Sequence, residues 1–544
     1  MIVLGLHGGV TINQHDPSAA LAIDGELIAI CEEERYLRIK SSYGYLPNYS
    51  IKACLAEAGI RFEDIDVFVT TGVTYDEADE RWADYLRHQF GTRPKIERVH
   101  HQEAHLATAF YGSPFDKAIC LSLDATGDGS SGMTAIASRE NGFQILDDIP
   151  ARNSLGMFYT LMTRYLGFAD LDEYKLMGLA TYGENTFDLN PVLKLNGQGW
   201  TFENSFMRNE PVVRSPFEPL YSEKLAEFFG QPSRKPGEEI TDFHRNLARS
   251  TQAHFESCLF ELVKSLHERF PEIPNFCFAG GAALNCVANR LILFSGMFEN
   301  VYVSPVAADR GLGAGCAYLG AARSGDTPAP MTTPYLGSAY SNDDILDELQ
   351  SNGVAYKTLG DPAQTGAELL ADGKIIGWHQ GRSEAGARAL GNRSILATAG
   401  DANMRDKVNA RIKYREEFRP FAPSALFESA DRFFDTKGLE FPSMSIAVDA
   451  LPATADQIRA VVHFDGTSRL QTVKPAQNET YHRLIESYGK LTGTPVILNT
   501  SFNLNGQPIV ETPRDALMTF FGCGLDALIV GDVLIEKDRS ASGL

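Results

Sequence analysis

The sequence lacks the patterns that mark secretion, membrane insertion and zinc knuckles. Its eight cysteines include no C-x-x-C pair, and several lie in apolar runs, as expected of buried free thiols. The N-terminus MIVLGLHGG has neither the basic segment nor the long apolar core of a signal peptide. No apolar run approaches the roughly 20 residues of a membrane span. We therefore expect a cytoplasmic protein without a membrane partner.

Positive charge is also scarce. Lysine and arginine number 49 against 70 aspartates and glutamates, which gives a net charge of −21. Such a surface repels phosphate backbones and disfavours a nucleic-acid partner, although it leaves room for a small basic pocket. With 44% hydrophobic and 22% charged residues the composition is that of a globular protein. A length of 544 residues predicts at least two domains.

The first half of the chain contains an apparent duplication. Residues 2–34 and 117–148 each read as an apolar strand, a bend rich in glycine or acidic residues, and a hairpin. Two such copies are the plan of the actin-like ATPase fold, whose bends bind nucleotide phosphates. The alternative is two unrelated hairpins in an α/β domain.

A long helix, a linker and a second α/β domain follow. Apolar residues recur at helical spacing over 246–270, and a short strand then ends at Gly280-Gly281, where a ligand could approach the backbone closely. Proline and threonine concentrate in 324–338, which predicts a linker. Beyond it we expect a helix near 363–371 and strands at KIIGWHQG, MSIAVDA, TPVILNTSFN and DALIVGDVLIEK.

Two histidines and two aspartates form a candidate metal site. His101 and His105 are four residues apart, so on a helix they share one face. Asp124 and Asp309 each follow an apparent strand, where functional residues of α/β folds often lie. Such a mixed nitrogen and oxygen site suits Fe(II), Zn(II) or Mn(II). An ordinary exposed or capping histidine pair is the alternative, and spacing alone does not show that the four residues meet.

Cations are unusually dense in two segments of the second domain. The cluster comprises Arg382, Arg388, Arg393, Arg411, Lys413, Arg415 and Arg419. Guanidinium groups bind phosphate or carboxylate oxygens in a bidentate way, so the pattern predicts a site for a compact dianion. The alternatives are a solvated basic face or pairing with Glu384, Glu416 and Glu417.

Three further features carry polar groups. Residues 498–503 end a predicted strand with amides and hydroxyls, which suit a nucleotide or a carbonyl, or simply a turn. His15 lies near the first predicted hairpin and could act as a general base. Taken alone, His15 and Lys40 equally fit ordinary surface residues.

Together these stretches resemble the O-carbamoyltransferases of the NodU/CmcH family, which modify nodulation factors, cephems, aminoglycosides and macrolides. The matching segments include HDPSAALAIDGELIAICEEER, HHQEAH, LDATGDG, EYKLMGLATYG, FAGGAALN, GRSEAGARALGNRSILA, FRPFAPS, DGTSRLQTV and LNTSFNLNGQPIVETPRDAL. The resemblance implies a Kae1-like, actin-like carbamoyl-transfer domain over residues 1–335. It also implies a YrdC-like domain, a twisted α/β sheet that forms carbamoyl-adenylate, over residues 336–544.

The resemblance also implies a reaction and its residues. Carbamoyl phosphate would be cleaved to carbamate, carbamate would attack ATP (with Mg) to give carbamoyl-AMP and pyrophosphate, and a small-molecule hydroxyl would accept the carbamoyl group. The implied roles are carbamoyl phosphate binding by Arg388, Lys413 and Arg419, nucleotide binding by Gly280, Gly281, Asn285, Asn499 and Ser501, metal binding, suggested to be of iron, by His101, His105, Asp124 and Asp309, and catalysis by His15, Lys40, Arg388 and Arg419. The identity of the acceptor stays open, as does the oligomeric state, for which a homodimer is one option.

Three other functions deserve weight. A transferase of threonylcarbamoyl to tRNA is disfavoured by the net charge of −21. A hydrogenase-maturation carbamoyltransferase would carry zinc knuckles, which need C-x-x-C pairs. A non-catalytic, actin-like nucleotide-binding scaffold would have no use for the arginine-rich segments.

Overall fold

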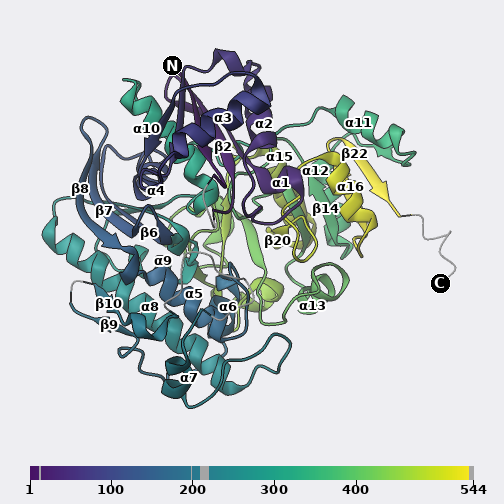
Figure 1. The fold of residues 1–544 in the computed structure, drawn as a ribbon. Coiled ribbons are helices and arrows are strands. Elements are labelled where there is room, and N and C mark those ends of the chain that lie inside the picture. Colours follow the sequence, from purple (N-terminus) through teal and green to yellow (C-terminus); the bar gives the residue numbers. More distant parts are fainter. Residues whose placement is uncertain (11–13, 198, 209–219, 538–544) are drawn as a thin grey trace. The chain divides into compact units, whose positions relative to one another are not determined.

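The computed structural model describes residues 1–10, 14–197, 199–208 and 220–537. The chain forms two compact units (Figure 1). The first comprises Met1–Ile30 and Tyr43–Thr332, and the second comprises Cys31–Ser42 and Thr333–Leu544. The units divide in sequence inside the predicted linker. The membership of Cys31–Ser42 in the second unit was not predicted.

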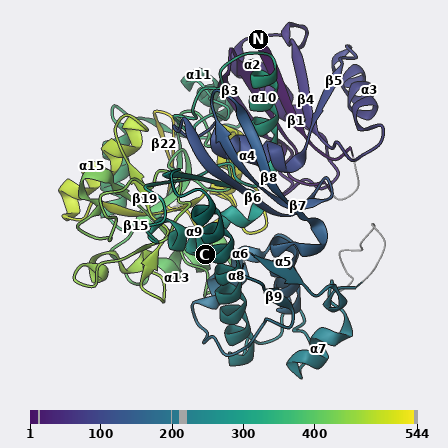
Figure 2. The same ribbon diagram turned by 90° about the vertical axis from the view of Figure 1, so that its left-hand side faces the viewer.

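The first unit is built from two sheets with the same strand order. The orders are β3-β2-β1-β4-β5 and β8-β7-β6-β11-β12. In each sheet the central strand pairs antiparallel with one neighbour and parallel with the other. In the first sheet β1 pairs antiparallel with β2 and parallel with β4, and in the second sheet β6 pairs antiparallel with β7 and parallel with β11. The duplication predicted from residues 2–34 and 117–148 is therefore confirmed, and with it an actin-like, mixed α/β architecture. Figure 2 shows β1, β4 and β5 side by side and, in the other sheet, β6, β7 and β8.

Two helices join the repeats of the first unit. Helix α4 follows the first sheet and packs on β6 and β11, whereas α10 follows the second sheet and packs on β1 and β2. The two helices also pack on each other. Glycine permits this approach, because a methyl group on Gly315 of α10 would overlap the carbonyl group of Ala104 in α4. The N-terminal ends of both helices carry residues of the predicted metal site.

The first unit has the following elements. Its strands are β1 Ile2–His7, β2 Ser18–Ile23, β3 Glu26–Glu32, β4 Val67–Thr71, β5 Ile96–Val99, β6 Lys117–Gly127, β7 Ser130–Ser138, β8 Gly142–Pro150, β9 Leu193–Leu195, β10 Trp200–Phe202, β11 Asn275–Ala279 and β12 Asn300–Val303, of which β3 runs on into the second unit. Its helices are α2 Asn48–Ala58, α3 Ala78–Phe90, α4 His101–Phe110, α5 Leu155–Tyr165, α6 Glu173–Ala180, α7 Glu223–Phe229, α8 Asp242–Arg269, α9 Cys286–Leu293 and α10 Leu312–Arg323. The long helix predicted over 246–270 is α8.

The second unit contains an eight-stranded mixed sheet in the order β13-β22-β21-β14-β15-β20-β16-β19. Helices α12 and α15 pack together, and their apolar residues form one core cluster with side chains of the sheet, among them Trp378 and Ile529. Local signals start these helices: Asp361 caps α12 ahead of a proline at its first position, and Asn478 caps α15.

One strand prediction in this unit was wrong. The segment DALIVGDVLIEK was expected to form one strand, but it forms the antiparallel pair β21 and β22. Gly531 allows the reversal because it adopts a φ of +52°, which favours glycine. No helix in the described ranges combines the length and the apolar character that a bilayer crossing requires.

The second unit has the following elements. Its strands are β13 Lys357–Thr358, β14 Ile376–His379, β15 Arg393–Thr398, β16 Ala422–Leu426, β17 Val448–Asp449, β18 Thr467–Ser468, β19 Gln471–Val473, β20 Val496–Ser501, β21 Ala527–Val530 and β22 Val533–Glu536. Its helices are α1 Glu33–Leu37, α11 Asn342–Ser351, α12 Pro362–Ala371, α13 Met404–Val408, α14 Phe427–Ala430, α15 Glu479–Thr492 and α16 Pro513–Phe521.

Candidate functional site

The four predicted metal ligands meet in the first unit. One nitrogen or oxygen atom from each of His101, His105, Asp124 and Asp309 lies within 4.8 Å of the others. The Nε2 atom of His101 is 3.1 Å from Asp124 Oδ2 and 3.6 Å from Asp309 Oδ1. All four residues are buried. Helix α4 supplies both histidines, β6 supplies Asp124, and Asp309 begins the short turn before α10.

His105 shows that this cluster suits a cation. Its Nε2 atom is 3.4 Å from both aspartates, yet within the described chain neither ring nitrogen makes a hydrogen bond. A fully buried imidazole without a hydrogen-bond partner is costly, and a bound metal ion would satisfy its lone pair. Burial lowers the pKa of His105, but the two carboxylates more than offset this effect and raise it to about 9. Two imidazoles and two carboxylates are an apt donor set for Fe(II), Zn(II) or Mn(II).

Sequence reasoning missed Asp128, which holds the start of α4. Its carboxylate accepts hydrogen bonds from the main-chain N–H groups of His101, Gly72 and Thr74. It therefore ties the first histidine ligand to the loop after β4. Asp128 has a φ of +51°, a conformation that aspartate tolerates better than most residues. The signal was present in the motif LDATGDG, where Asp128 stands between two glycines.

Gly127 offers a test of the cluster. A methyl group at this position would overlap the His101 ring, so we expect Gly127→Ala to displace that ligand. Bound metal per chain should fall by about 10-fold, as after loss of an orienting contact at a metal site. Elemental analysis by mass spectrometry measures this. Gly360→Ala is the control, because a methyl group there meets no described atom within 4 Å. Full metal content in Gly127→Ala would contradict the assignment.

His15 lies beside the metal ligands. Its Nδ1 atom is 3.1 Å from Asp16 Oδ2, and its Nε2 atom is 3.9 Å from Asp309 Oδ2. Burial lowers the pKa of His15, but the hydrogen bond to Asp16 and the charge of Asp309 raise it to about 9. Asp16 is held in turn by Arg310, whose Nη2 atom is 3.2 Å from Asp16 Oδ1. Asp16 and Arg310 were not predicted, although each adjoins a residue that was.

Of the three residues of this unit predicted to bind nucleotide, Gly281 adjoins the metal cluster, whereas Asn285 has other partners. A methyl group on Gly281 would lie 2.8 Å from Asp124 Oδ1, so the bare backbone adjoins the cluster. The preceding Gly280 has a φ of +88°. Asn285 has local partners: it caps α9 by accepting from Ala288 N–H and exchanges two hydrogen bonds with the Gln252 amide. Asn285, for which the resemblance implied nucleotide binding, therefore caps a helix and pairs with Gln252.

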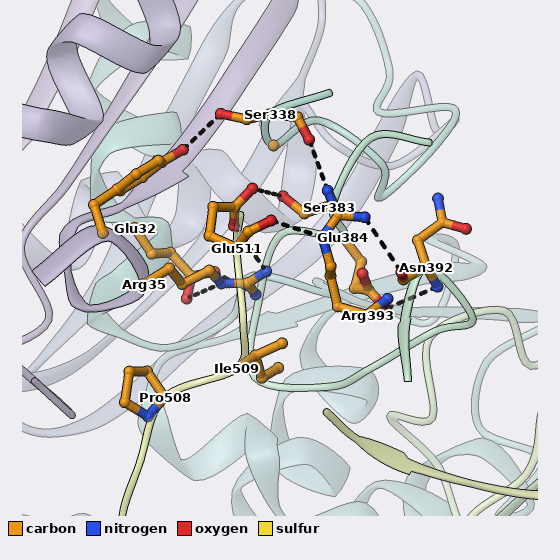
Figure 3. A network of polar contacts seen from close by, with 12 residues as sticks. Glu32, Arg35, Ser338, Ser383, Glu384, Asn392, Arg393, Pro508, Ile509 and Glu511 are labelled. Atoms are coloured by element: carbon orange, nitrogen blue, oxygen red, sulfur yellow. Dashed lines mark hydrogen bonds and ion pairs between the residues drawn. The ribbon is translucent and has the colours of Figure 1, made fainter. Parts of the chain in front are cut away.

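In the second unit, several of the clustered arginines bind the chain itself. The guanidinium of Arg393 is fully buried and donates to the carbonyl groups of Gln380, Ser338 and Glu511 (Figure 3). Arg382 donates to the carbonyl groups of Gly337 and Leu336. Arg411 forms an ion pair of 2.8 Å with Asp526. These three side chains therefore support the fold, which accounts for part of the cation density.

Arg388 lies in a loop that is fixed on both sides. The Glu384 carboxylate accepts hydrogen bonds from the N–H groups of Leu390, Asn392 and Arg393. The Asn499 amide donates to the carbonyl group of Ala389, next to Arg388. We call residues 384–393 the arginine loop. Arg388 itself is half-buried.

The other predicted phosphate ligands differ in their surroundings. The ammonium group of Lys413 is buried and donates to Ser501 and Asn503, including the Asn503 side chain at 2.8 Å. Burial, with Arg415, Arg419 and Lys40 nearby, lowers the pKa of Lys413. Arg419 forms an ion pair of 3.6 Å with Glu416, as one alternative had anticipated. Lys40 is exposed and belongs to the second unit, whereas His15 belongs to the first.

Comparison with known proteins identifies the family. A model described as "Carbamoyltransferase N-terminus" matches residues 81–318, and one described as "Carbamoyltransferase C-terminus" matches residues 367–537. The chain belongs to the carbamoyltransferase family. This carbamoyltransferase is 36% identical to the nodulation protein NolNO of Sinorhizobium fredii, over 100% of this chain and 83% of the relative. It is 37% identical to the nodulation protein NolO of Bradyrhizobium diazoefficiens, over 82% of this chain and 80% of the relative.

A more distant relative covers the chain almost completely. The nodulation protein U of Rhizobium tropici is 30% identical to this carbamoyltransferase, over 97% of this chain and 95% of the relative. The family resemblance predicted from the motifs is thus confirmed, and the protein is a carbamoyl-transferring enzyme.

Proposed function

We propose that this carbamoyltransferase makes carbamoyl-AMP from carbamoyl phosphate and ATP and passes the carbamoyl group to a hydroxyl of a small molecule. Water cleaves carbamoyl phosphate to carbamate and inorganic phosphate, and the carbamate attacks the α-phosphorus of ATP and displaces pyrophosphate. The acceptor oxygen then attacks the carbamoyl carbon, loses its proton and displaces AMP. The observation that carries the proposal is the buried cluster of His101, His105, Asp124 and Asp309, whose donor atoms lie within 4.8 Å of one another.

The proposed adenylation depends on cations of the second unit. Arg388 would bind the phosphate group of carbamoyl phosphate with its half-buried guanidinium, on a loop whose backbone Glu384 and Asn499 hold. Arg419, which lies near Lys413, would add a second guanidinium. Lys413 would act through Ser501, which it holds in place. Fixed cations neutralise the negative charge of phosphate groups without reorganising during the reaction.

The proposed transfer belongs to the first unit. The four residues His101, His105, Asp124 and Asp309 would hold a metal ion, and such an ion supplies Lewis acidity toward an anhydride carbonyl. Gly280 and Gly281 leave the backbone bare beside Asp124, where the nucleotide part of the adenylate could lie. His15, in its neutral form, would take the proton of the acceptor hydroxyl; its pKa of about 9 makes that form the minor one at neutral pH. Asp16 orients its imidazole from one side by the 3.1 Å contact to Nδ1, and Nε2 faces the cluster, 3.9 Å from Asp309 Oδ2.

His15→Gln tests the base assignment. We expect the rate of acceptor carbamoylation to fall by about 10²- to 10⁴-fold, the usual contribution of a general base. Carbamoyl phosphate-dependent exchange of labelled pyrophosphate into ATP should stay near the wild-type rate, because His15 takes no part in adenylation. His88→Gln is the control, since His88 is exposed on α3. Equal loss in both assays would refute the assignment.

The overall proposal has a direct test. The protein is mixed with ATP, Mg, carbamoyl phosphate and a library of sugars and polyketide glycosides, and carbamoylated products are identified by mass spectrometry. Pyrophosphate and AMP should accumulate together. Release of ADP in place of AMP would overturn the carbamoyl-AMP route.

A further inference from the structure

The arginine loop receives support from a distant part of the sequence. Glu32 ends β3 and Arg35 lies in α1, within the segment that belongs to the second unit. Both side chains are buried, with 3% exposure each. Neither was singled out in the sequence, where EEER reads as an ordinary charged run.

These two residues form hydrogen bonds with both polar main-chain groups of Gly386, its N–H and its C=O. Glu32 Oε1 accepts from Gly386 N–H at 2.6 Å, and Arg35 Nη2 donates to Gly386 C=O at 2.8 Å. Arg35 also lies 3.4 Å from Glu32, which keeps the two charges together. Gly386 has a φ of +99°, a conformation that favours glycine. The hydrogen bonds to Glu32 and Arg35 fix this conformation.

Arg388 is only two residues further along the loop. The Glu32–Arg35 pair holds the loop before Arg388, while Asn499 holds Ala389 directly after it. A buried charged pair usually costs desolvation energy, so its presence under one loop calls for a purpose beyond stability. The pair's two hydrogen bonds to the arginine loop are to its backbone, at Gly386.

A third residue completes the network. Glu511 lies with its Oε2 atom 3.8 Å from Arg35 Nη1 and accepts from the Ser383 hydroxyl at 2.7 Å. Ser383 directly precedes the arginine loop. Glu32, Arg35, Ser383 and Glu511 are seen together in Figure 3. The same charged network therefore contacts the chain at the beginning of the loop as well as at Gly386.

We propose that Glu32 and Arg35 are positioning residues for Arg388. By fixing the backbone of Gly386, they hold the loop so that the Arg388 side chain can bind carbamoyl phosphate. The inference rests on the proposed function, since it takes Arg388 as a phosphate ligand. Glu32 and Arg35 act through the loop and do not touch the substrate. Their loss should weaken the binding of carbamoyl phosphate and leave the binding of ATP nearly intact.

The experiment measures KM for each cosubstrate by pyrophosphate exchange in the full-length enzyme. We expect Glu32→Ala to raise KM for carbamoyl phosphate by about 10- to 100-fold, the scale of a lost charge-assisted hydrogen bond, with a much smaller change for ATP. Glu32→Gln should recover part of the loss, because an amide oxygen still accepts from Gly386. Arg35→Lys is a milder change that serves if Glu32→Ala does not fold. We expect it to raise the KM for carbamoyl phosphate as well.

Two controls separate positioning from general destabilisation. Asp361→Ala removes the cap of α12 in the same unit and no contact to Gly386. It should lower the melting temperature with little change in either KM. A rise in KM for both cosubstrates in Glu32→Ala, or an equal rise in Asp361→Ala, would overturn the inference.

A double variant distinguishes this inference from the proposed function. Calorimetry with carbamoyl phosphate should show that Glu32→Ala weakens binding in the wild-type background and adds nothing in an Arg388→Ala background. A further loss in that background would overturn the positioning role. Wild-type binding by Arg388→Ala alone would instead refute the proposed phosphate site. Impaired Arg388→Ala with an unchanged Glu32→Ala would refute only the positioning role.

Discussion

Arg388→Ala should reduce carbamoyl phosphate-dependent pyrophosphate exchange by about 10²- to 10³-fold, the effect of removing one preorganised charge from a reacting phosphate. The loop itself should survive the change, because Glu384 and Asn499 hold its backbone without using the Arg388 side chain. The loss should therefore appear in the reaction while the loop backbone keeps its contacts to Glu384 and Asn499.

Arg405→Ala provides the matched control for this experiment. Arg405 is an arginine of the same unit that is 41% exposed and paired with its neighbour Asp406. It should exchange pyrophosphate at the wild-type rate, since exposed ion pairs contribute little. Arg388→Lys should retain only part of the activity, because an ammonium group lacks the two parallel donors of a guanidinium. Undiminished exchange in Arg388→Ala would remove this residue from the proposed site.

His105→Ala should have the opposite pattern of effects. We expect bound metal to fall by at least about 10-fold, since a direct ligand matters more than an orienting neighbour. Acceptor carbamoylation should fall by about 10²-fold or more, because Lewis-acid stabilisation is worth several kcal/mol. Pyrophosphate exchange should change little. Metal analysis and the two activity assays on one preparation test all three statements.

The outcome of His105→Ala also tests the separation of the two reactions. His88→Ala, at an exposed position in the same unit, should match the wild type in every assay. If His105→Ala slows exchange and transfer to the same extent, the two half-reactions do not use separate sites. If metal content stays unchanged, the cluster has another purpose.

Local patterns predicted the parts of the fold that depend on neighbouring residues. The spacing of His101 and His105 predicted one helical face, and both lie on α4. The repeated strand and hairpin pattern predicted the two matching sheets. The hairpin at Gly531 was missed because the apolar residues on both sides of it read as one continuous run.

Contacts between distant residues were beyond such reasoning. Spacing could not show that Asp124 and Asp309 converge, because this depends on how α4 and α10 pack. Likewise Arg382 and Arg393 read as anion ligands, yet their partners are carbonyl groups supplied by the folded loops. Sequence patterns report which side chains carry charge, whereas tertiary structure determines which charges remain available for a substrate.

The division of the chain has a consequence for recombination between relatives. A chimera joined at residue 333 would combine the segment Cys31–Ser42 of one parent with the arginine loop of the other. Compatible parents would need matching residues at positions 32, 35 and 386, although about 350 residues separate them. Exchanging the short N-terminal segment together with the C-terminal half should therefore rescue chimeras that a single crossover inactivates.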